Sequence, residues 1–564
     1  MIPVPALSPA ARVRDAYARI AEVDRPEVWI ALRPEAEVLA EAEAQDPALP
    51  LAGVLVAVKD NIDVAGLDTT AGARSYAYRP ERDATAVARL RAAGAIVIGK
   101  ANLDQFATGL VGTRSPFGAV RNAWDPTRIS GGSSSGSATA VALGIVDIAL
   151  GTDTAGSGRV PAALGGIVGV KPTRGIVPAT GVVPACRSLD CVTVFGRSLE
   201  LSRAAVEVMS GPDGEDPLAR DDLAIADLPT RPRVAVPLPA QLAGLDEGWD
   251  GAFAAAVDRF RQLGCEVVEV DIAPLLEAAT LLYDGAFVAE RYAAVGAHIE
   301  AHPDLVGDDL DPTVAGIVLA GARPSAADLF ADRERLDLLA AASRRVLGDA
   351  VALLTPTTTG HPTLAEVAQD PVGANSRLGR YTNCANLLDL ASLAIPAGAV
   401  AGLPFGVMLT GPAFTDRRLA ALATAFLAPT VDLLVVGAHL RGEPLNGQLV
   451  AAGGSFLRDA ATAPAYRLYA LDTVPPKPGL VRVAPGTEAP GTDGRGASIA
   501  GELWRLPTAG FATFTAALPA PMAIGRVTLD DGSEVRGFLV EGFAVEGATE
   551  ITGHGGWRAY RSAV

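Results

Sequence analysis

Residues 129–162, ISGGSSSGSATAVALGIVDIALGTDTAGSGRVPA, decide how the rest of the chain is interpreted. Two turns rich in glycine and serine, 130–137 and 151–158, flank an apolar segment at 138–150. We expect that segment to form a buried helix that passes into a strand. Glycine permits positive φ and close approach of other groups, so such turns often line functional sites.

Three functions fit these turns. A flexible linker would explain the composition, but linkers do not usually bracket apolar segments. A phosphate-binding loop is the second, although neither turn matches GxxxxGK[ST] or GxGxxG. The third is a nucleophile, Ser157, with an oxyanion hole formed by the backbone N–H groups of residues 154–157, namely Thr154, Ala155, Gly156 and Ser157 itself. This third function needs a base, and the chain offers one.

Lysine is scarce in this chain, which makes each lysine informative. Of 47 basic residues only four are lysine: Lys59, Lys100, Lys171 and Lys477. Lys59 follows the apolar run 54–58, so it is predicted to lie at the end of a buried strand. Burial can lower a lysine pKa by several units and leave a neutral amine, whereas arginine stays protonated. We therefore favour Lys59 as a base over a solvated surface charge.

Composition and charge narrow the function classes. A chain of 564 residues, 49% hydrophobic and 20% charged, predicts a globular protein of two or more domains. The net charge of −17 argues against nucleic-acid and anionic-membrane partners. Any anion site must therefore supply its own local cations. The N-terminal sequence shows no signal-peptide pattern, and the four cysteines fit a reducing compartment without zinc, so a cytoplasmic location is expected.

The pattern of segments changes once along the chain. Short Val/Ile runs alternate with helical segments through the first part, which predicts an α/β domain at 1–428 with covered sheet faces. From 432 to 564 short strands with Gly/Pro turns, among them 480–484, predict a separate β-rich domain. The expected helices are 1–45, 84–93, 199–209, 249–263, most of 272–350, 381–390 and 416–427. Residues 53–64 are expected to form a strand and a turn, and further strands of the first domain are expected at 96–99, 233–236, 266–270, 351–356 and 404–409.

Six motifs in order resemble the amidase signature family of serine hydrolases: VAVKDNIDVAG, GKANLDQFATG, GGSSSGSATAVA, GTDTAGSGRVPA, GVKPTRG and GLPFGVML. The resemblance implies a mixed central sheet covered by helices and a Ser–cis-Ser–Lys triad. In this sequence Ser157 would be the nucleophile, Ser133 the bridging serine on a cis peptide and Lys59 the general base. Ala155 stands where the family has glycine, which is tolerable if that position has no positive φ.

Several segments resemble one branch of that family, the allophanate hydrolases: 102–118, 184–195, 381–390 and the appended C-terminal domain. Allophanate is a small anion, and the resemblance implies that a tyrosine and an arginine eight residues apart hold its carboxylate. Tyr283 and Arg291 have that spacing, and on one helix both could face one pocket. The alternative is a surface helix with Arg291 paired to an acid. Asp153 and Arg159, beside Ser157, are expected to form a structural ion pair.

The C-terminal domain resembles that of the allophanate hydrolases, with a γ-glutamylcyclotransferase-like fold. The resemblance implies that it processes N-carboxycarbamate, released by the first domain, to ammonia and carbon dioxide. His439, in VVGAHLRG, is the candidate residue, with a satisfied loop histidine as the alternative. An inactive domain would be a structural or dimerisation module. The resemblance further implies a homodimer, coupling to a urea carboxylase, and no metal or organic cofactor.

Two other functions stay open. The first is a subunit of a transamidation complex, which would need a partner and glutaminase activity. This function leaves the C-terminal extension unexplained. A broad-specificity amidase would turn over neutral amides and be indifferent to Arg291.

Overall fold

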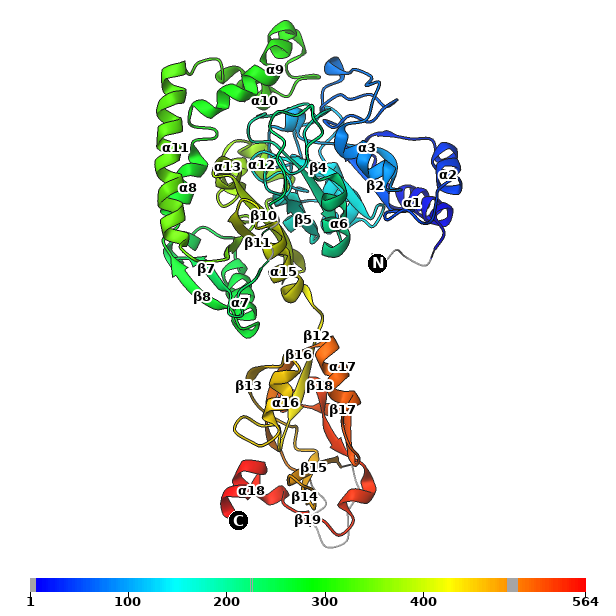
Figure 1. Cartoon of the computed structure of the whole chain (residues 1–564), viewed down its shortest axis with the longest axis vertical. Helices are drawn as coiled ribbons and strands as arrows, with labels where there is room; N and C mark the ends of the chain where they lie inside the picture. Colours follow the sequence, from blue (N-terminus) through cyan, green and yellow to red (C-terminus); the bar gives the residue numbers. More distant parts are fainter. Residues whose placement is uncertain (1–6, 224, 226, 484–495) are drawn as a thin grey trace. The chain divides into compact units, whose positions relative to one another are not determined.

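A computed structural model describes residues 7–223, 225, 227–483 and 496–564 of the chain. The structure divides into two compact units, Met1–Phe426 and Leu427–Val564. Figure 1 shows the first as a helix-covered sheet and the second as a smaller unit rich in strands. None of the helices in the described part is long and apolar enough to cross a membrane.

A mixed sheet forms the centre of the first unit. Within the described residues it contains eleven strands in the order β1-β3-β2-β4-β6-β5-β10-β11-β9-β7-β8. β2 pairs in parallel with β3 and β4, and β7 pairs in parallel with β8 and β9. In the middle of the sheet, the successive pairs β4–β6, β6–β5, β5–β10, β10–β11 and β11–β9 are antiparallel. The strands are β1 (Trp29–Leu32), β2 (Leu55–Lys59), β3 (Ile96–Ala101), β4 (Ile148–Asp153), β5 (Val168–Lys171), β6 (Cys191–Gly196), β7 (Arg233–Pro237), β8 (Glu266–Val270), β9 (Ala352–Pro356), β10 (Leu390–Val400) and β11 (Leu403–Pro412).

Helices cover both faces of this sheet. The strands carry apolar side chains on both faces, and these side chains have to be buried. In β2, Leu55 and Ala57 pack in one buried cluster, and Val56 and Val58 pack in another. In Figure 1, α1 and α2 lie on the opposite side of the unit from α11. The helices are α1 (Pro9–Val23), α2 (Glu35–Glu43), α3 (Thr85–Ala92), α4 (Ser135–Ala142), α5 (Val160–Gly165), α6 (Leu199–Met209), α7 (Trp249–Gln262), α8 (Ala273–Thr280), α9 (Ala289–Ala301), α10 (Pro312–Ala320), α11 (Ala326–Leu347), α12 (Leu364–Gln369), α13 (Gly373–Leu378), α14 (Cys384–Leu387) and α15 (Asp416–Leu427). The predicted fold class is confirmed.

Two predictions of secondary structure were wrong. The N-terminal region is not continuously helical, because β1 pairs with β3 between α1 and α2, and Pro26 and Pro34 flank the strand. Residues 1–6 of that prediction lie outside the described residues. The helix expected at 381–390 is only the single turn of α14, since Asp389 takes a φ of +53°. The chain then continues as β10, a strand that pairs antiparallel with β11.

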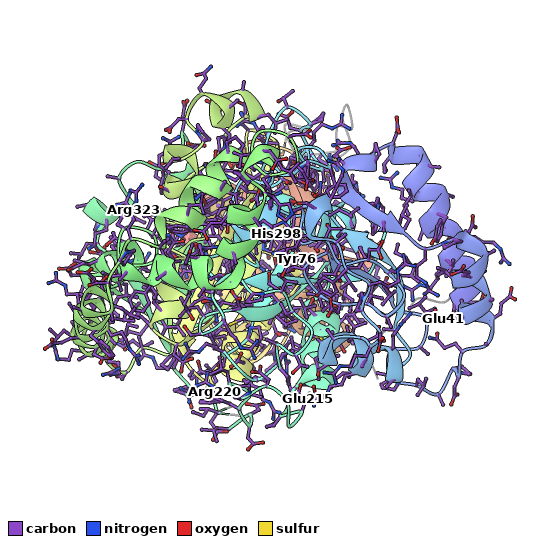
Figure 2. The ribbon with its side chains drawn as sticks, turned by 90° about the horizontal axis from the view of Figure 1, so that it is seen from above. Glu41, Tyr76, Glu215, Arg220, His298 and Arg323 are labelled. Atoms are coloured by element: carbon purple, nitrogen blue, oxygen red, sulfur yellow. The ribbon has the colours of Figure 1, made fainter. Side chains whose placement is uncertain are left out.

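An aromatic cluster fixes α9 against loops from the N-terminal half of the first unit. Tyr76, in the short helix η2 (Arg74–Tyr76), lies 5.1 Å from His298 of α9 and 5.4 Å from Phe106, measured between ring centroids. Figure 2 shows Tyr76 and His298 side by side. Phe106 belongs to η3 (Gln105–Ala107), which directly precedes Thr108. The cluster therefore holds α9 close to the loop at 108–109.

The second unit contains, in its described residues, a five-stranded sheet in the order β13-β16-β12-β18-β17 and a three-stranded sheet in the order β15-β14-β19. Its core includes Tyr466, Trp504 and Trp557. The predicted β-rich character is confirmed, with three helices added, and residue 484 of the expected strand 480–484 lies outside the described residues. The elements are β12 (Thr430–Val435), α16 (Asn446–Ala451), β13 (Ser455–Ala461), β14 (Tyr466–Leu471), β15 (Lys477–Arg482), β16 (Ala500–Pro507), α17 (Thr508–Ala516), β17 (Met522–Thr528), β18 (Glu534–Val540), β19 (Thr549–Glu550) and α18 (Trp557–Ala563).

Candidate active site

Lys59 is the last residue of β2 and is completely buried. Its Nζ lies 2.8 Å from Ser133 Oγ and 2.8 Å from Thr152 Oγ1. Ser133 follows a cis peptide bond from Gly132, and Thr152 is near the end of β4, the parallel neighbour of β2. Two adjacent strand ends and one turn thus bring these side chains together.

Burial lowers the pKa of Lys59 to about 7. Desolvation is the main cause, and Asp104, Asp190 and Asp153 only partly offset it through their charges. The positive charge of Arg291 lowers the pKa further. A neutral amine is therefore available near pH 7, and it can accept a proton from Ser133.

Ser157 lies just beyond β4 and is 2% exposed. Its Oγ donates a long hydrogen bond of 3.5 Å to the carbonyl of Gly109, and the structure records no hydrogen bond between the two described serines, Ser157 and Ser133. The structure thus joins Lys59 to Ser133 but does not complete the predicted relay to Ser157. Catalytic hydrogen bonds of this kind often tighten only when substrate is bound.

The predicted oxyanion donors are not equivalent. The Gly156 N–H donates to Asp153 Oδ1 at 2.9 Å, so it is already committed and the prediction needs correction at this residue. Gly156 has a φ of +137°, and a Cβ there would lie 2.3 Å from Thr382 Oγ1, so only glycine fits. Ala155 has no positive φ, which meets the condition for alanine at that position. Thr154, Ala155 and Ser157 itself remain as candidate donors.

Asp153 and Arg159 form the expected ion pair. Arg159 donates from Nε and Nη2 to the two carboxylate oxygens at 2.9 and 2.8 Å, and both side chains are fully buried. Arg159 also reaches Asn386 Oδ1 and the Thr382 carbonyl near α14. Because Asp153 binds the N–H groups of Gly156 and Gly158 as well, this pair fixes the turn that carries Ser157.

Arg291 and Tyr283 are in contact. Arg291 Nη2 donates to Tyr283 Oη at 3.0 Å, and the guanidinium lies 5.0 Å from the centroid of the tyrosine ring. The prediction that one helix carries both residues was wrong: Arg291 belongs to α9, while Tyr283 lies in the turn after α8. Gly285, with extended backbone, interrupts the helical path. Arg291 is 1% exposed, which excludes the surface-helix alternative.

Arg291 also approaches the nucleophile. Its Nη1 donates to Thr108 Oγ1 at 2.8 Å, and the next residue, Gly109, accepts from Ser157. Its Nε is buried and has no hydrogen-bond partner among the described residues. A buried guanidinium with a spare donor near the reactive serine can bind a small carboxylate.

The sequence reasoning missed three polar groups here. Thr152 and Thr108 lie within the six motifs but carried no separate signal. Asp190 accepts from the N–H groups of Ala185 and Cys186 and from Thr154 Oγ1, and burial raises its pKa to about 6. Its position inside the segment 184–195 was the available signal.

His439 lies in the second unit, in the turns after β12, whereas Lys59 belongs to the first unit. Its ring stacks on Phe538 at 4.9 Å and meets Phe514 edge-on at 5.3 Å. Its Nε2 lies 3.0 Å from Gln448 Oε1, so the amide favours the tautomer with a proton on Nε2. Burial lowers the pKa of His439, which keeps the imidazole neutral.

Comparisons with known proteins match each of the two units to a known family. Residues 12–420 match the Amidase family, and residues 431–562 match the allophanate hydrolase C-terminal domain. The chain is 40% identical to the urea amidolyase of Saccharomyces cerevisiae over 96% of its own length. It spans only 31% of that relative, about a third of the curated protein.

Solved structures add a match of nearly equal length. Kluyveromyces lactis allophanate hydrolase is 40% identical, with a TM-score of 0.70, and the alignment covers 99% of this chain and 97% of that one. A glutamyl-tRNA(Gln) amidotransferase chain of Thermus thermophilus is 38% identical over 76% of this chain and 94% of the relative. That relative does not account for the second unit.

Proposed function

The chain belongs to the amidase family, as its six motifs predicted, and from this premise we propose that it is an amidohydrolase that cleaves allophanate. The single observation that carries the choice of substrate is the buried Arg291, which contacts Tyr283 and Thr108 next to the Gly109 carbonyl that accepts from Ser157. Asp190 and Glu290 act on Arg291 through their charges but form no ion pair with it, so a neutral amide would leave this buried cation without a carboxylate in direct contact.

In the first step, neutral Lys59 takes a proton from Ser133, and Ser133 takes one from Ser157 as it attacks the terminal amide carbon. For this relay the Ser157 side chain rotates from Gly109 toward Ser133, a change within the ordinary range of serine rotamers. The N–H groups of Thr154, Ala155 and Ser157 are the candidates to stabilise the oxyanion. One such donor is worth about 3 kcal/mol in comparable sites.

The proton on Lys59 then returns through Ser133 to the leaving nitrogen, and ammonia departs. Water attacks the acyl-enzyme by the same relay in reverse and releases N-carboxycarbamate. Arg291 and Tyr283 would hold the substrate carboxylate during both steps, because the guanidinium donates to Tyr283 Oη and the two groups are therefore close enough to bind one carboxylate together.

The second unit would then decompose N-carboxycarbamate to carbon dioxide and carbamate, which yields the second ammonia. His439 is supported as the proton carrier by its neutral state and by its fixed tautomer, which leaves Nδ1 with a lone pair. The match of residues 431–562 to the allophanate hydrolase C-terminal domain supports this assignment over a merely structural unit.

The setting of the enzyme is part of the proposal. The similarity to urea amidolyases supports a role in urea degradation, in which a urea carboxylase supplies the substrate. The four cysteines are free and buried, which supports a cytoplasmic location. The family resemblance supports a homodimer.

The test is ammonia release by the purified chain from allophanate, measured beside glutamine and a neutral aliphatic amide. We expect two ammonia per allophanate and little from the other substrates. Activity confined to neutral amides would overturn the choice of substrate, and release from glutamine that depends on a partner would favour a component of a transamidation complex.

A further inference from the structure

The second unit contains a cavity of about 550 Å³ lined by residues from the turns after β12 and from α16, α17, β15, β17 and β18. Most of its wall is apolar. The polar side chains in the wall are His439, Gln448, Lys477 and Thr513. None of the described lining residues is aspartate or glutamate, although the whole chain carries a net charge of −17.

Lys477 is the charged group of this wall. It is half-buried at the first position of β15, where its backbone is fixed by pairing with Leu471 of β14. Its side chain has no ion-pair or hydrogen-bond partner among the described residues. A cation that faces an apolar cavity without a carboxylate is a site for an anion.

The other lysines of the chain each have a partner. Lys59 contacts Ser133, Lys100 forms a buried ion pair with Asp60 at 2.9 Å, and Lys171 donates to the Pro172 carbonyl. Among the four lysines, Lys477 is therefore the one whose ammonium group has no protein partner among the described residues and can bind a ligand. In a chain that uses arginine for nearly every other cation, a lysine here provides a compact ammonium that can approach one carboxylate oxygen.

We propose that Lys477 binds one carboxylate of N-carboxycarbamate in this cavity and thereby places the other carboxyl group beside His439. This inference rests on the proposed function of the second unit. The cavity is much larger than the intermediate, so charge rather than shape has to orient the ligand. Burial is the main cause of the lowered pKa of His439, and the positive charge of Lys477 adds to it.

The step balances without a further reactant. With one carboxylate held by Lys477, the other group reacts as a carboxylic acid. His439 Nδ1 takes its proton and delivers it to the nitrogen as the C–N bond breaks. The electron pair of that bond stays on nitrogen, carbon dioxide leaves, and carbamate remains on Lys477. The apolar wall, which includes Phe514 and Phe538, favours the neutral acid form of the departing carboxyl group.

The kinetic test uses the full chain with ¹³C-labelled allophanate and compares carbon dioxide release with the first ammonia in a single turnover. We expect Lys477→Met to slow carbon dioxide release at least about tenfold, the loss of one charge-assisted contact, and Lys477→Arg to recover part of it. The matched control is Arg482→Met, which removes an exposed cation from the other end of β15 and should leave the release unchanged. A normal rate in Lys477→Met would overturn the proposal.

A binding test separates this inference from the proposed function. Malonate is a stable dicarboxylate analogue of N-carboxycarbamate, and its binding is measured by calorimetry on an Arg291→Ala background, which removes the other anion site. We expect affinity to fall about tenfold or more with Lys477→Met and not with Arg482→Met. Malonate binding that is absent or indifferent to Lys477 would overturn the inference. If His439→Gln leaves carbon dioxide release unchanged while malonate binding depends on Lys477, only the proposed second step fails and the anion site stands.

Discussion

The two candidate sites each contain one buried base, but their surroundings differ. Lys59 ends a central strand and is held by Ser133 and Thr152, with three carboxylates near enough to act on its pKa. His439 lies on a turn between two phenylalanine rings, with one amide as its partner. Burial lowers the pKa of both groups.

The difference reflects the chemistry that each site has to perform. Attack by serine develops an oxyanion and needs a rigid set of polar groups fixed on strand ends. Loss of carbon dioxide from an un-ionised carboxyl group is favoured by an apolar wall with one cationic anchor for the remaining carboxylate. A change confined to one site should leave the reaction at the other site unaltered, so the second reaction serves as an internal reference.

The largest effect is expected from the base of the first site. Lys59→Arg keeps the positive charge but cannot lose its proton, so ammonia release should fall by about 10⁴-fold, as should that of Ser157→Ala. The measurement is initial ammonia release from allophanate. Near-normal turnover in Lys59→Arg would exclude Lys59 as the base.

In the second site, His439→Gln should slow carbon dioxide release about a hundredfold while the first ammonia appears at the normal rate. The physical reason is that glutamine keeps a polar side chain at this position but cannot carry the proton. Stopped-flow detection of carbon dioxide measures the step. Equal slowing of both products would mean that His439 affects the whole chain rather than one unit.

Removal of Arg291, which is proposed to bind the substrate carboxylate in the first site, should lower the preference for allophanate over neutral amides. Arg291→Ala is expected to lower kcat/KM for allophanate by about 30-fold, mainly through KM, because a buried charge-assisted contact is lost. Arg291→Lys should recover part of the loss. The same variants are assayed on a neutral amide, and equal losses on both substrates would make Arg291 a structural residue.

Over a single pH unit, the smallest expected effect is the pH dependence of the first site. The reacting form of Lys59 is the neutral amine, and its pKa is about 7. The value of kcat/KM should therefore rise about tenfold per pH unit below 7 and level off above it. A profile that is flat from pH 5 to 9 would contradict a lysine base with this pKa.

The sequence predicted the parts of the molecule in which local pattern and tertiary structure agree. The apolar run before Lys59 placed that residue at the end of a buried strand, and the alternation of short segments gave the α/β class. The separation of eight residues predicted that Tyr283 and Arg291 are close, and they are in contact. A turn between two helices, rather than one continuous helix, makes this contact. β10 was missed because Pro396 and Asp389 interrupt its sequence pattern, whereas its pairing with β5 and β11 depends on distant segments.

What the sequence determined by itself was the set of chemical groups: the serines in glycine-rich turns, one lysine able to act as a base, and a second unit with its own histidine. Only the tertiary structure decided which of these groups meet. Among the described residues, it committed the Gly156 N–H to Asp153 and left Arg291 Nε and Lys477 without protein partners. The physical reason is that hydrogen bonding and desolvation depend on neighbours that the chain brings together from far apart in sequence, and no local pattern records them.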